Sequence, residues 1–147
     1  FNVLKYAWSL CLNPNVNTVL SVDEAHVLLG EKNILGAEFL AQVQRRARKY
    51  NTGTIIITQQ PSDFVGEGMI THGKAIFDNA SYYLVMGLKK QAAEDLAQLI
   101  DLNDNEKEGI KRYSQGQGLF VCGNRRMQIN VVVSEKELES FGSGGGY

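Results

Sequence analysis

Residues 18–27 read TVLSVDEAHV, an apolar run that ends abruptly in two carboxylates. Four of the five residues before Asp23 are β-branched or aliphatic, which is typical of a strand buried on both faces. Asp23 and Glu24 follow at the carboxyl end of this strand, where parallel α/β sheets bind their ligands. The stretch therefore predicts an α/β fold with an acidic site at one edge of its sheet.

This acidic pair has the arrangement of the Walker B element of nucleotide hydrolases. One carboxylate can hold Mg²⁺ through its water shell, and the second can orient or deprotonate an attacking water. The alternative is a buried strand that ends in a solvated acidic turn. The apolar run directly before Asp23 favours the Walker B interpretation.

Length and composition indicate one ordinary globular domain. The chain has 147 residues, of which 44% are hydrophobic and 21% are charged. A formal net charge of −1 excludes a generally basic nucleic-acid binder. No apolar run is long enough to span a membrane, and the isolated Cys11 and Cys122 predict reduced thiols in a cytosolic protein.

Periodicity and turn residues divide the chain into alternating helices and strands. Helices are expected at residues 3–12, 34–50, 69–78, 91–100, 103–113 and 134–141. Strands are expected at residues 18–22, 54–58, 82–86, 118–122 and 127–133, the last two joined as a hairpin. This order predicts a mainly parallel sheet, covered by helices on both faces and edged by one antiparallel hairpin. Both ends indicate a fragment, because Phe1 lies inside a helical pattern and residues 142–147 form a Gly/Ser-rich, flexible tail.

A polar residue, Gln59, follows the second expected strand. Neighbouring parallel strands end at the same edge, so Gln59 could reach the catalytic water or a γ-phosphate near Glu24. A neutral amide suits this task because it donates to phosphate and accepts from water at the same time. The alternative, that Gln59 bonds its own loop, remains open at this point.

Arginines occur in two further places of interest. Residues 45–49 read RRARK at the end of a helix, where cations complement the helix dipole or, alternatively, supply an arginine finger to a neighbouring subunit. Arg125 and Arg126 lie in the hairpin turn, where they either contact a phosphate or base or stay in solvent. His26 and His72 have no obvious partners, and we assign them no catalytic role.

The sequence contains no G-x-x-x-x-G-K-[ST] segment, the loop that cradles nucleotide phosphates. In this class of protein that loop precedes Walker B along the chain. We therefore expect that the chain by itself does not hydrolyse ATP at a useful rate.

Three blocks of sequence carry a family resemblance. They read VLSVDEAHVLL, QRRARKYNTGTIIITQQPSDF and GQGLFVCGNRRMQINVVVSEKELESF, in that order. As a set they resemble the conjugative type IV secretion ATPases of the VirB-four, TraC and TrbE family, in the FtsK/HerA group of RecA-like motors. The resemblance implies a RecA-like P-loop NTPase core, of which residues 1–141 are the C-terminal portion without the Walker A half.

The resemblance also implies roles for the matched residues. Asp23 would coordinate Mg²⁺ through water, and Glu24 would polarise the water that attacks ATP. Gln59 would be the sensing glutamine, and Arg48, with Arg45 as the alternative, would act in trans on a neighbouring subunit.

Two other positions bear on the match to this family. Arg125 would correspond to the family's last motif, which lies near the nucleotide. His26 departs from the Trp often found at its position, although this does not affect the two carboxylates.

For the whole protein, the resemblance implies an ATP-hydrolysing motor of a bacterial conjugation or type IV secretion system. Such a motor would power assembly of the apparatus or transfer of DNA or protein. It would form a hexamer, contact secretion-channel and coupling-protein subunits, and have DNA as a further candidate partner. It would lie in the bacterial cytoplasm, held at the inner face of the membrane through its partners.

Three alternatives remain. An FtsK/HerA-type DNA translocase or conjugative coupling protein has the same core, and a non-hydrolysing assembly module would need no phosphate loop. Residues 23–26 also spell DEAH, the box of a helicase superfamily. Those helicases carry Ser-Ala-Thr on the next core strand, where this chain has Thr58, Gln59 and Gln60.

Overall fold

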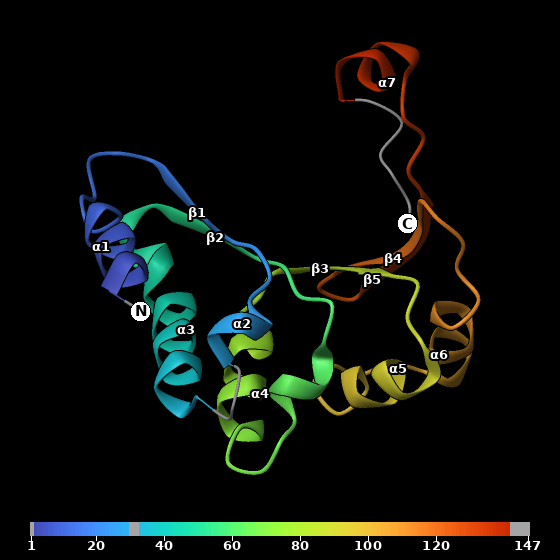
Figure 1. Cartoon of the computed structure of the whole chain (residues 1–147), viewed down its shortest axis with the longest axis horizontal. Coiled ribbons are helices and arrows are strands. Elements are labelled where there is room, and N and C mark those ends of the chain that lie inside the picture. The colour runs from blue at the N-terminus through green and yellow to red at the C-terminus, as the bar shows by residue number, and fades with distance from the viewer. Residues whose placement is uncertain (1, 30–32, 142–147) are drawn as a thin grey trace.

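A computed structural model describes residues 2–29 and 33–141 (Figure 1). Along the chain the elements are α1 (Asn2–Leu10), β1 (Thr18–Val22), α2 (His26–Leu29), α3 (Ile34–Ala47), η2 (Arg48–Tyr50), β2 (Thr52–Ile56), η3 (Pro61–Phe64), α4 (Ile70–Asp78), β3 (Tyr82–Met86), α5 (Lys90–Leu96), α6 (Asp104–Ile110), β4 (Gln117–Cys122), β5 (Arg125–Asn130) and α7 (Glu135–Phe141). Helices and strands alternate up to β3, so the expected α/β class is confirmed.

The strands form two separate sheets in the described part of the chain. β1 and β2 pair in parallel, from Thr18 opposite Thr52 to Val22 opposite Ile56. β3, β4 and β5 form an antiparallel sheet in that order, and β4 and β5 make the expected hairpin. Among the described strands, parallel pairing is therefore confined to β1 and β2, whereas we expected it through most of the sheet.

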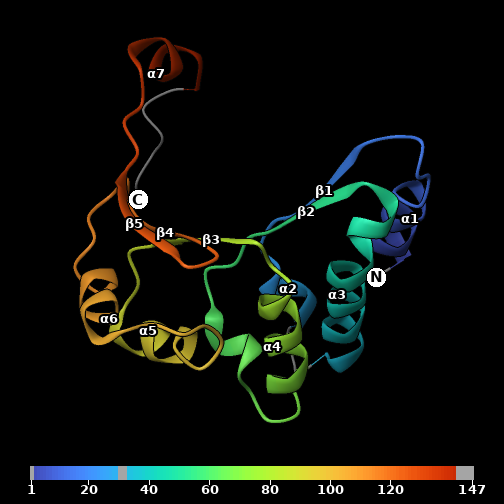
Figure 2. The same ribbon diagram turned by 180° about the vertical axis from the view of Figure 1, so that it is seen from behind.

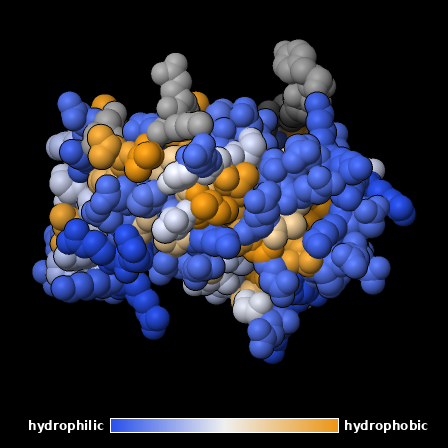
Figure 3. Space-filling model, turned by 90° about the horizontal axis from the view of Figure 1, so that it is seen from below, coloured by the Kyte–Doolittle hydropathy of each residue, from blue (hydrophilic) through white to orange (hydrophobic). Residues whose placement is uncertain are grey.

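The helices α2 to α6 lie on one side of the strands, as Figures 1 and 2 show from opposite directions. The other side leaves apolar strand residues exposed: Val19 (68%), Ile55 (50%), Tyr82 (63%), Leu84 (55%) and Met86 (39%). We expected strands buried on both faces, and this is wrong in the described chain because these helices cover only one face. Figure 3 shows that helical side, where hydrophilic residues dominate and apolar residues surface in separate areas.

The core lies between the strands and the helices. Its largest fully buried side chains are Phe64, Leu29, Leu40, Met69, Ile110 and Val43. Two glycines allow the close packing around α2 and η3, because a Cβ at Gly36 would collide with the Leu28 carbonyl and one at Gly73 with the Phe64 carbonyl. Helix α2, which follows the acidic pair, is thereby held tightly against α3.

Element boundaries agree with the sequence to within a few residues. β1 and β3 begin and end where predicted, whereas β2 begins at Thr52, two residues early, because it pairs from there with β1. The expected helix 34–50 ends in the 3₁₀ turn η2. The predicted tail, residues 142–147, lies outside the described residues.

Two predicted helix starts are also confirmed. Asn103 and Glu106 form a capping box at α6, and Ser134 and Glu137 bond one another at the start of α7. None of the helices in the described part of the chain is long and apolar enough to cross a membrane.

Candidate active site

The carboxyl ends of β1 and β2 are joined by backbone hydrogen bonds beyond the strands themselves. Ile57 N donates to Val22 O, and Ala25 N donates to Ile57 O, both at 2.9 Å. The two strands therefore stay in register as they leave the sheet. This brings the residues that follow them, Glu24 and Gln59, to neighbouring positions.

Glu24 has a left-handed backbone conformation, with φ of 48°. This conformation is uncommon for a residue with a long side chain and costs about 1–3 kcal/mol. Glu24 N donates to Asp23 Oδ1 at 2.8 Å, and Glu24 O accepts from Val27 N at 2.9 Å. The turn is therefore fixed on both sides of Glu24, which sets the direction of its side chain.

Gln59 contacts the Glu24 side chain directly. Its Nε2 donates to Glu24 Oε1 at 2.6 Å. We predicted that Gln59 would lie near Glu24, and this is confirmed. The Gln59 side chain bonds Glu24, which follows β1, instead of its own loop. Its role as a nucleotide sensor stays a prediction.

Glu24 has another neighbour, His26, which the sequence did not indicate. His26 Nδ1 lies 3.1 Å from Glu24 Oε2, and both atoms are shielded from solvent. The pair is at ion-pair distance, but its alignment falls outside hydrogen-bond geometry. We expected His26 to lack a partner, and this is wrong, because the left-handed turn at Glu24 folds the two side chains together.

Asp23 is exposed, and its Oδ1 accepts the hydrogen bond from Glu24 N. Its Oδ2 has no partner among the described residues, so it can face a hydrated cation. Across residues 2–29 and 33–141, no three His, Cys, Asp or Glu side chains cluster to hold a metal ion. One carboxylate fits Mg²⁺, because this ion commonly takes its other ligands from water and nucleotide phosphates.

Arg45 and Arg48 lie at the other end of the parallel strand pair. Arg48 opens η2 directly before β2, whereas Gln59 comes after the end of β2. The five residues of β2, which lie between these positions, alone span roughly 16 Å at about 3.3 Å per residue. Arg48 is exposed, and at this distance it cannot reach Glu24 of the same chain.

The neighbouring basic residues Arg46 and Lys49 both contact Tyr50. Arg46 Nη2 lies 3.3 Å from Tyr50 Oη, and the Lys49 ammonium lies 6.0 Å from the ring centre. The Arg46 hydrogen bond is the main cause that lowers the pKa of Tyr50. Arg45 and Arg48 have no such partner among the described residues, so they are the arginines of this helix end that can contact another molecule.

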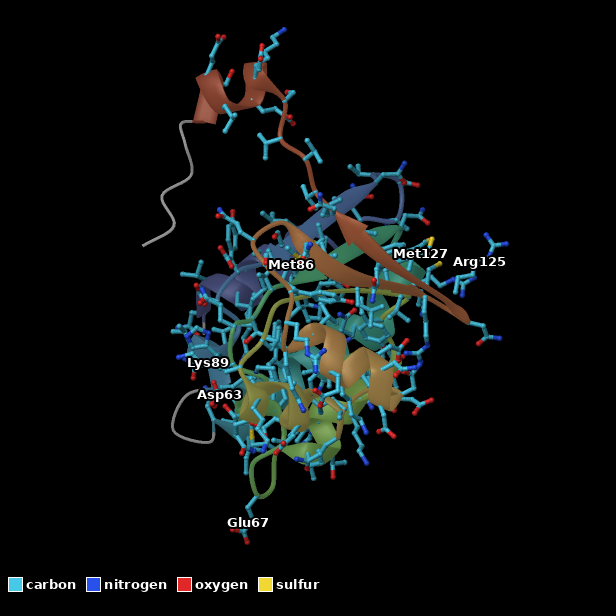
Figure 4. The ribbon with its side chains drawn as sticks, turned by 90° about the vertical axis from the view of Figure 1, so that its right-hand side faces the viewer. Asp63, Glu67, Met86, Lys89, Arg125 and Met127 are labelled. Atoms are coloured by element: carbon cyan, nitrogen blue, oxygen red, sulfur yellow. The ribbon has the colours of Figure 1, made fainter. Side chains whose placement is uncertain are left out.

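Of the two arginines in the β4–β5 hairpin, Arg126 is paired with another side chain and Arg125 is exposed. Arg126 Nη1 lies 2.9 Å from Glu106 Oε2 and so ties β5 to α6. Arg125 is exposed and projects outward beside Met127 (Figure 4). In that view it lies on the opposite side of the molecule from Asp63, which belongs to η3, shortly after Gln59. The structure thus brings Asp23, Glu24 and Gln59 together, but it does not bring Arg125 to them by any contact between described residues.

The comparisons with known proteins agree on the fold. No protein-family model matches the chain. VirB4 of Thermoanaerobacter pseudethanolicus matches with a TM-score of 0.85 and 32% identity, over 93% of this chain and 37% of that one. The genome-packaging NTPase B204 of Sulfolobus turreted icosahedral virus 2 matches over 80% of this chain at 15% identity. Its TM-scores are 0.57 in complex with ATP-γS and 0.54 in complex with AMPPCP, over 53% and 54% of that chain.

A sequence relative is an uncharacterized protein of Bacillus anthracis, 22% identical over 130 residues. That alignment covers 84% of this chain and 20% of the relative. The chain therefore spans only about a third of the VirB4 structure and a fifth of the Bacillus protein.

The fold and the acidic edge of the parallel strands define the class as a P-loop ATPase fold of the RecA-like type. Within this class, the similarity in both sequence and structure is to VirB4. The chain is VirB4-like in sequence and in fold, as the resemblance of its three sequence blocks implied.

Proposed function

We propose that this chain carries the water-activating part of a type IV secretion ATPase, within an ATP-hydrolysing motor that powers assembly of the apparatus or transfer of DNA or protein. The observation that supports this most is the 2.6 Å hydrogen bond between Gln59 and Glu24, at the carboxyl ends of adjacent parallel strands. In an α/β sheet this edge is the ligand-binding edge. The similarity of the fold to VirB4 supports this proposal.

Each residue of the site has a distinct task in this proposal. Asp23 is exposed and would hold hydrated Mg²⁺, which supplies charge neutralisation on the nucleotide phosphates. Glu24 would accept a proton from the attacking water. Gln59 touches the Glu24 carboxylate, so a change in its amide contacts when nucleotide binds would pass directly to Glu24.

Arg48 would act on the nucleotide of a neighbouring subunit, with Arg45 as the alternative and Arg125 as a further candidate contact. Arg48 is exposed, has no side-chain partner in the described chain, and lies at the strand end opposite Glu24. A finger from this end can therefore serve only another copy. This supports an oligomer with active sites between subunits, which we propose to be a hexamer.

The apolar residues exposed on one side of the strands support the proposal that this chain works as part of a larger unit. Val19 and Leu84 are more than half exposed on sheet faces that the helices α2 to α6 leave open. Apolar patches of this kind mark contact surfaces. We propose that other parts of the full-length protein, including a phosphate-binding loop, cover this side.

The partners in this proposal are further copies of the motor, secretion-channel and coupling-protein subunits, and DNA. The motor would lie at the inner face of the bacterial membrane, held there by these subunits. A DNA translocase or coupling protein of the FtsK/HerA group would share the same site.

A second candidate is an assembly module that binds channel subunits without hydrolysing nucleotide. The exposed apolar sheet side favours this candidate, since it could receive a partner protein directly. The helicase alternative is less well supported, because the residue after the second strand that contacts Glu24 is a glutamine.

The test is steady-state ATP hydrolysis by the full-length protein, wild type beside Glu24→Gln, across a range of protein concentrations. We expect Mg²⁺-dependent turnover that rises cooperatively with concentration. Glu24→Gln should lower it by about 10²- to 10⁴-fold, the usual contribution of a general base. Turnover that is absent, or indifferent to Glu24, would favour the assembly module.

A further inference from the structure

His26 lies against the proposed catalytic carboxylate, although we assigned it no catalytic role from the sequence. Its Nδ1 is 3.1 Å from Glu24 Oε2, while Gln59 Nε2 bonds the other oxygen, Oε1. The carboxylate therefore sits between two side chains that can each donate a hydrogen bond. We propose that His26 is a positioning residue, which together with Gln59 holds the Glu24 carboxylate in the orientation for water activation.

The backbone around His26 supports this proposal because it leaves the two side chains little freedom to separate. Ala25 N is bonded to Ile57 O, and Val27 N to Glu24 O, so the residues on both sides of His26 are anchored. His26 is the first residue of α2, and α2 packs on α3 with no room for a side chain at Gly36. Both ends of the Glu24–His26 contact are thus attached to fixed backbone.

The burial of the contacting atoms points the same way. His26 Nδ1 and Glu24 Oε2 are both shielded from solvent, whereas the Glu24 side chain as a whole is 43% exposed. A shielded polar atom without a partner costs about 1–3 kcal/mol. The two atoms can satisfy one another if the imidazole turns slightly, because they already lie within hydrogen-bond distance. In that arrangement the Nδ1–H of His26 donates a hydrogen bond to Glu24 Oε2.

This inference rests on the proposed function, because it assigns His26 to the same reaction. Small displacements of a catalytic group are costly, since misplacement by about 1 Å can lower a rate by about 10²-fold. Removal of the His26 donor should therefore lower kcat without weakening nucleotide binding, because His26 touches Glu24 rather than the nucleotide.

The experiment compares His26→Phe with His26→Asn in the full-length protein. Phenylalanine keeps the ring but has no donor, whereas the side-chain amide of asparagine can donate from close to the position of Nδ1. We expect His26→Phe to lower kcat by about 10-fold or more, with KM and the affinity for a fluorescent non-hydrolysable ATP analogue unchanged. His26→Asn should restore most of the turnover.

The control is the other histidine, His72 in α4, which should tolerate the same two substitutions without a change in kcat. Thermal unfolding of every variant shows whether the fold is intact. Wild-type kcat in His26→Phe, or equal losses in both His26 variants, would overturn the role of His26. The proposed function would still stand if Glu24→Gln lowered turnover as expected. Hydrolysis that does not depend on Glu24 would instead overturn the proposed function, and the role of His26 with it.

Discussion

The two ends of the β1–β2 strand pair each carry a non-glycine residue with a left-handed backbone, Asn51 (φ 51°) and Glu24 (φ 48°). The fold explains Asn51. It ends the 3₁₀ turn η2, its N–H bonds Arg48 O, and its side chain donates to Pro14 O at 2.8 Å. Asparagine is also among the residues that adopt this conformation most readily.

Glu24 also has backbone hydrogen bonds, but glutamate is not among the residues that favour the left-handed conformation. Its side chain bonds no backbone group, and it contacts Gln59 and His26 instead. Backbone strain that local structure does not require is concentrated at functional sites. Residue preference and a side-chain bond to the backbone explain the left-handed backbone at Asn51, whereas the one at Glu24 points to function. We call the Asn51 end of the strand pair the structural end and the Glu24 end the functional end.

The polar side chains at the two ends differ accordingly. At the structural end, Thr52 is 6% exposed, and its Oγ1 lies 2.6 Å from Thr18 Oγ1 and 3.0 Å from Cys11 O. At the functional end, the Glu24 side chain is 43% exposed and bonds other side chains. The polar groups at the structural end therefore bond within the fold, whereas the functional end presents a partly exposed acidic side chain held by other side chains.

The first prediction has the largest expected effect. It tests whether the structural end of one subunit contacts the functional end of the next subunit. Arg48→Ala should lower hydrolysis by at least ~10³-fold, the low end for an arginine finger, and leave nucleotide binding intact. Mixing Arg48→Ala protein with Glu24→Gln protein should then restore part of the turnover. Mixed interfaces combine Arg48 of one subunit with Glu24 of the next, and ATPase assays across mixing ratios measure this.

Arg45→Ala serves as the matched variant, since Arg45 is the other arginine of this helix end without a partner among residues 2–29 and 33–141. If Arg45→Ala shows the loss and the complementation instead, Arg45 is the finger. Unchanged turnover in Arg48→Ala would remove Arg48 from the site, and mixtures that stay inactive would contradict its action in trans.

A smaller effect is expected from Thr52→Val at the structural end. This substitution removes the buried hydroxyl that contacts Thr18 Oγ1 and Cys11 O, so it should lower the free energy of unfolding by about 1–3 kcal/mol. Its kcat should match the wild type. Urea unfolding and ATPase assays measure the two quantities.

Thr71→Val in α4 is the control for Thr52→Val, because Thr71 is exposed. A surface substitution of this kind should change stability by no more than about 0.5 kcal/mol. Equal stability of the two variants would show that the Thr52 hydroxyl does not hold the structural end together.

Much of the fold was predictable because local patterns determine it. β1 and β3 follow runs of β-branched, aromatic and aliphatic residues, and Asn103 starts α6 with a capping box. The one-sided burial was not predictable. Val19 and Ile55 are apolar, like residues of a core, yet both are exposed. The sequence does not show that the helices cover only one of the two sheet faces.

Part of the site was also predictable, because it follows from the strand topology. Parallel strands end at one edge, so the closeness of Glu24 and Gln59 follows from topology. The contact with His26 depends on a left-handed turn at a glutamate, which residue preferences do not predict. The contact of Arg46 with Tyr50 is local, across 4 residues, whereas the ion pair of Arg126 with Glu106 depends on packing between segments 20 residues apart.

The smallest expected effect measures the backbone strain itself. Glycine adopts the left-handed conformation without penalty, whereas alanine keeps the Cβ that causes the strain. The free energy of unfolding of Glu24→Gly should therefore exceed that of Glu24→Ala by about 1 kcal/mol, although both variants lose turnover. Asn51→Gly and Asn51→Ala should differ by a similar amount, and both should keep kcat, because Asn51 lies at the structural end. If Glu24→Ala proved as stable as Glu24→Gly, the turn at Glu24 would be unstrained, and its conformation would no longer distinguish the functional end from the structural one.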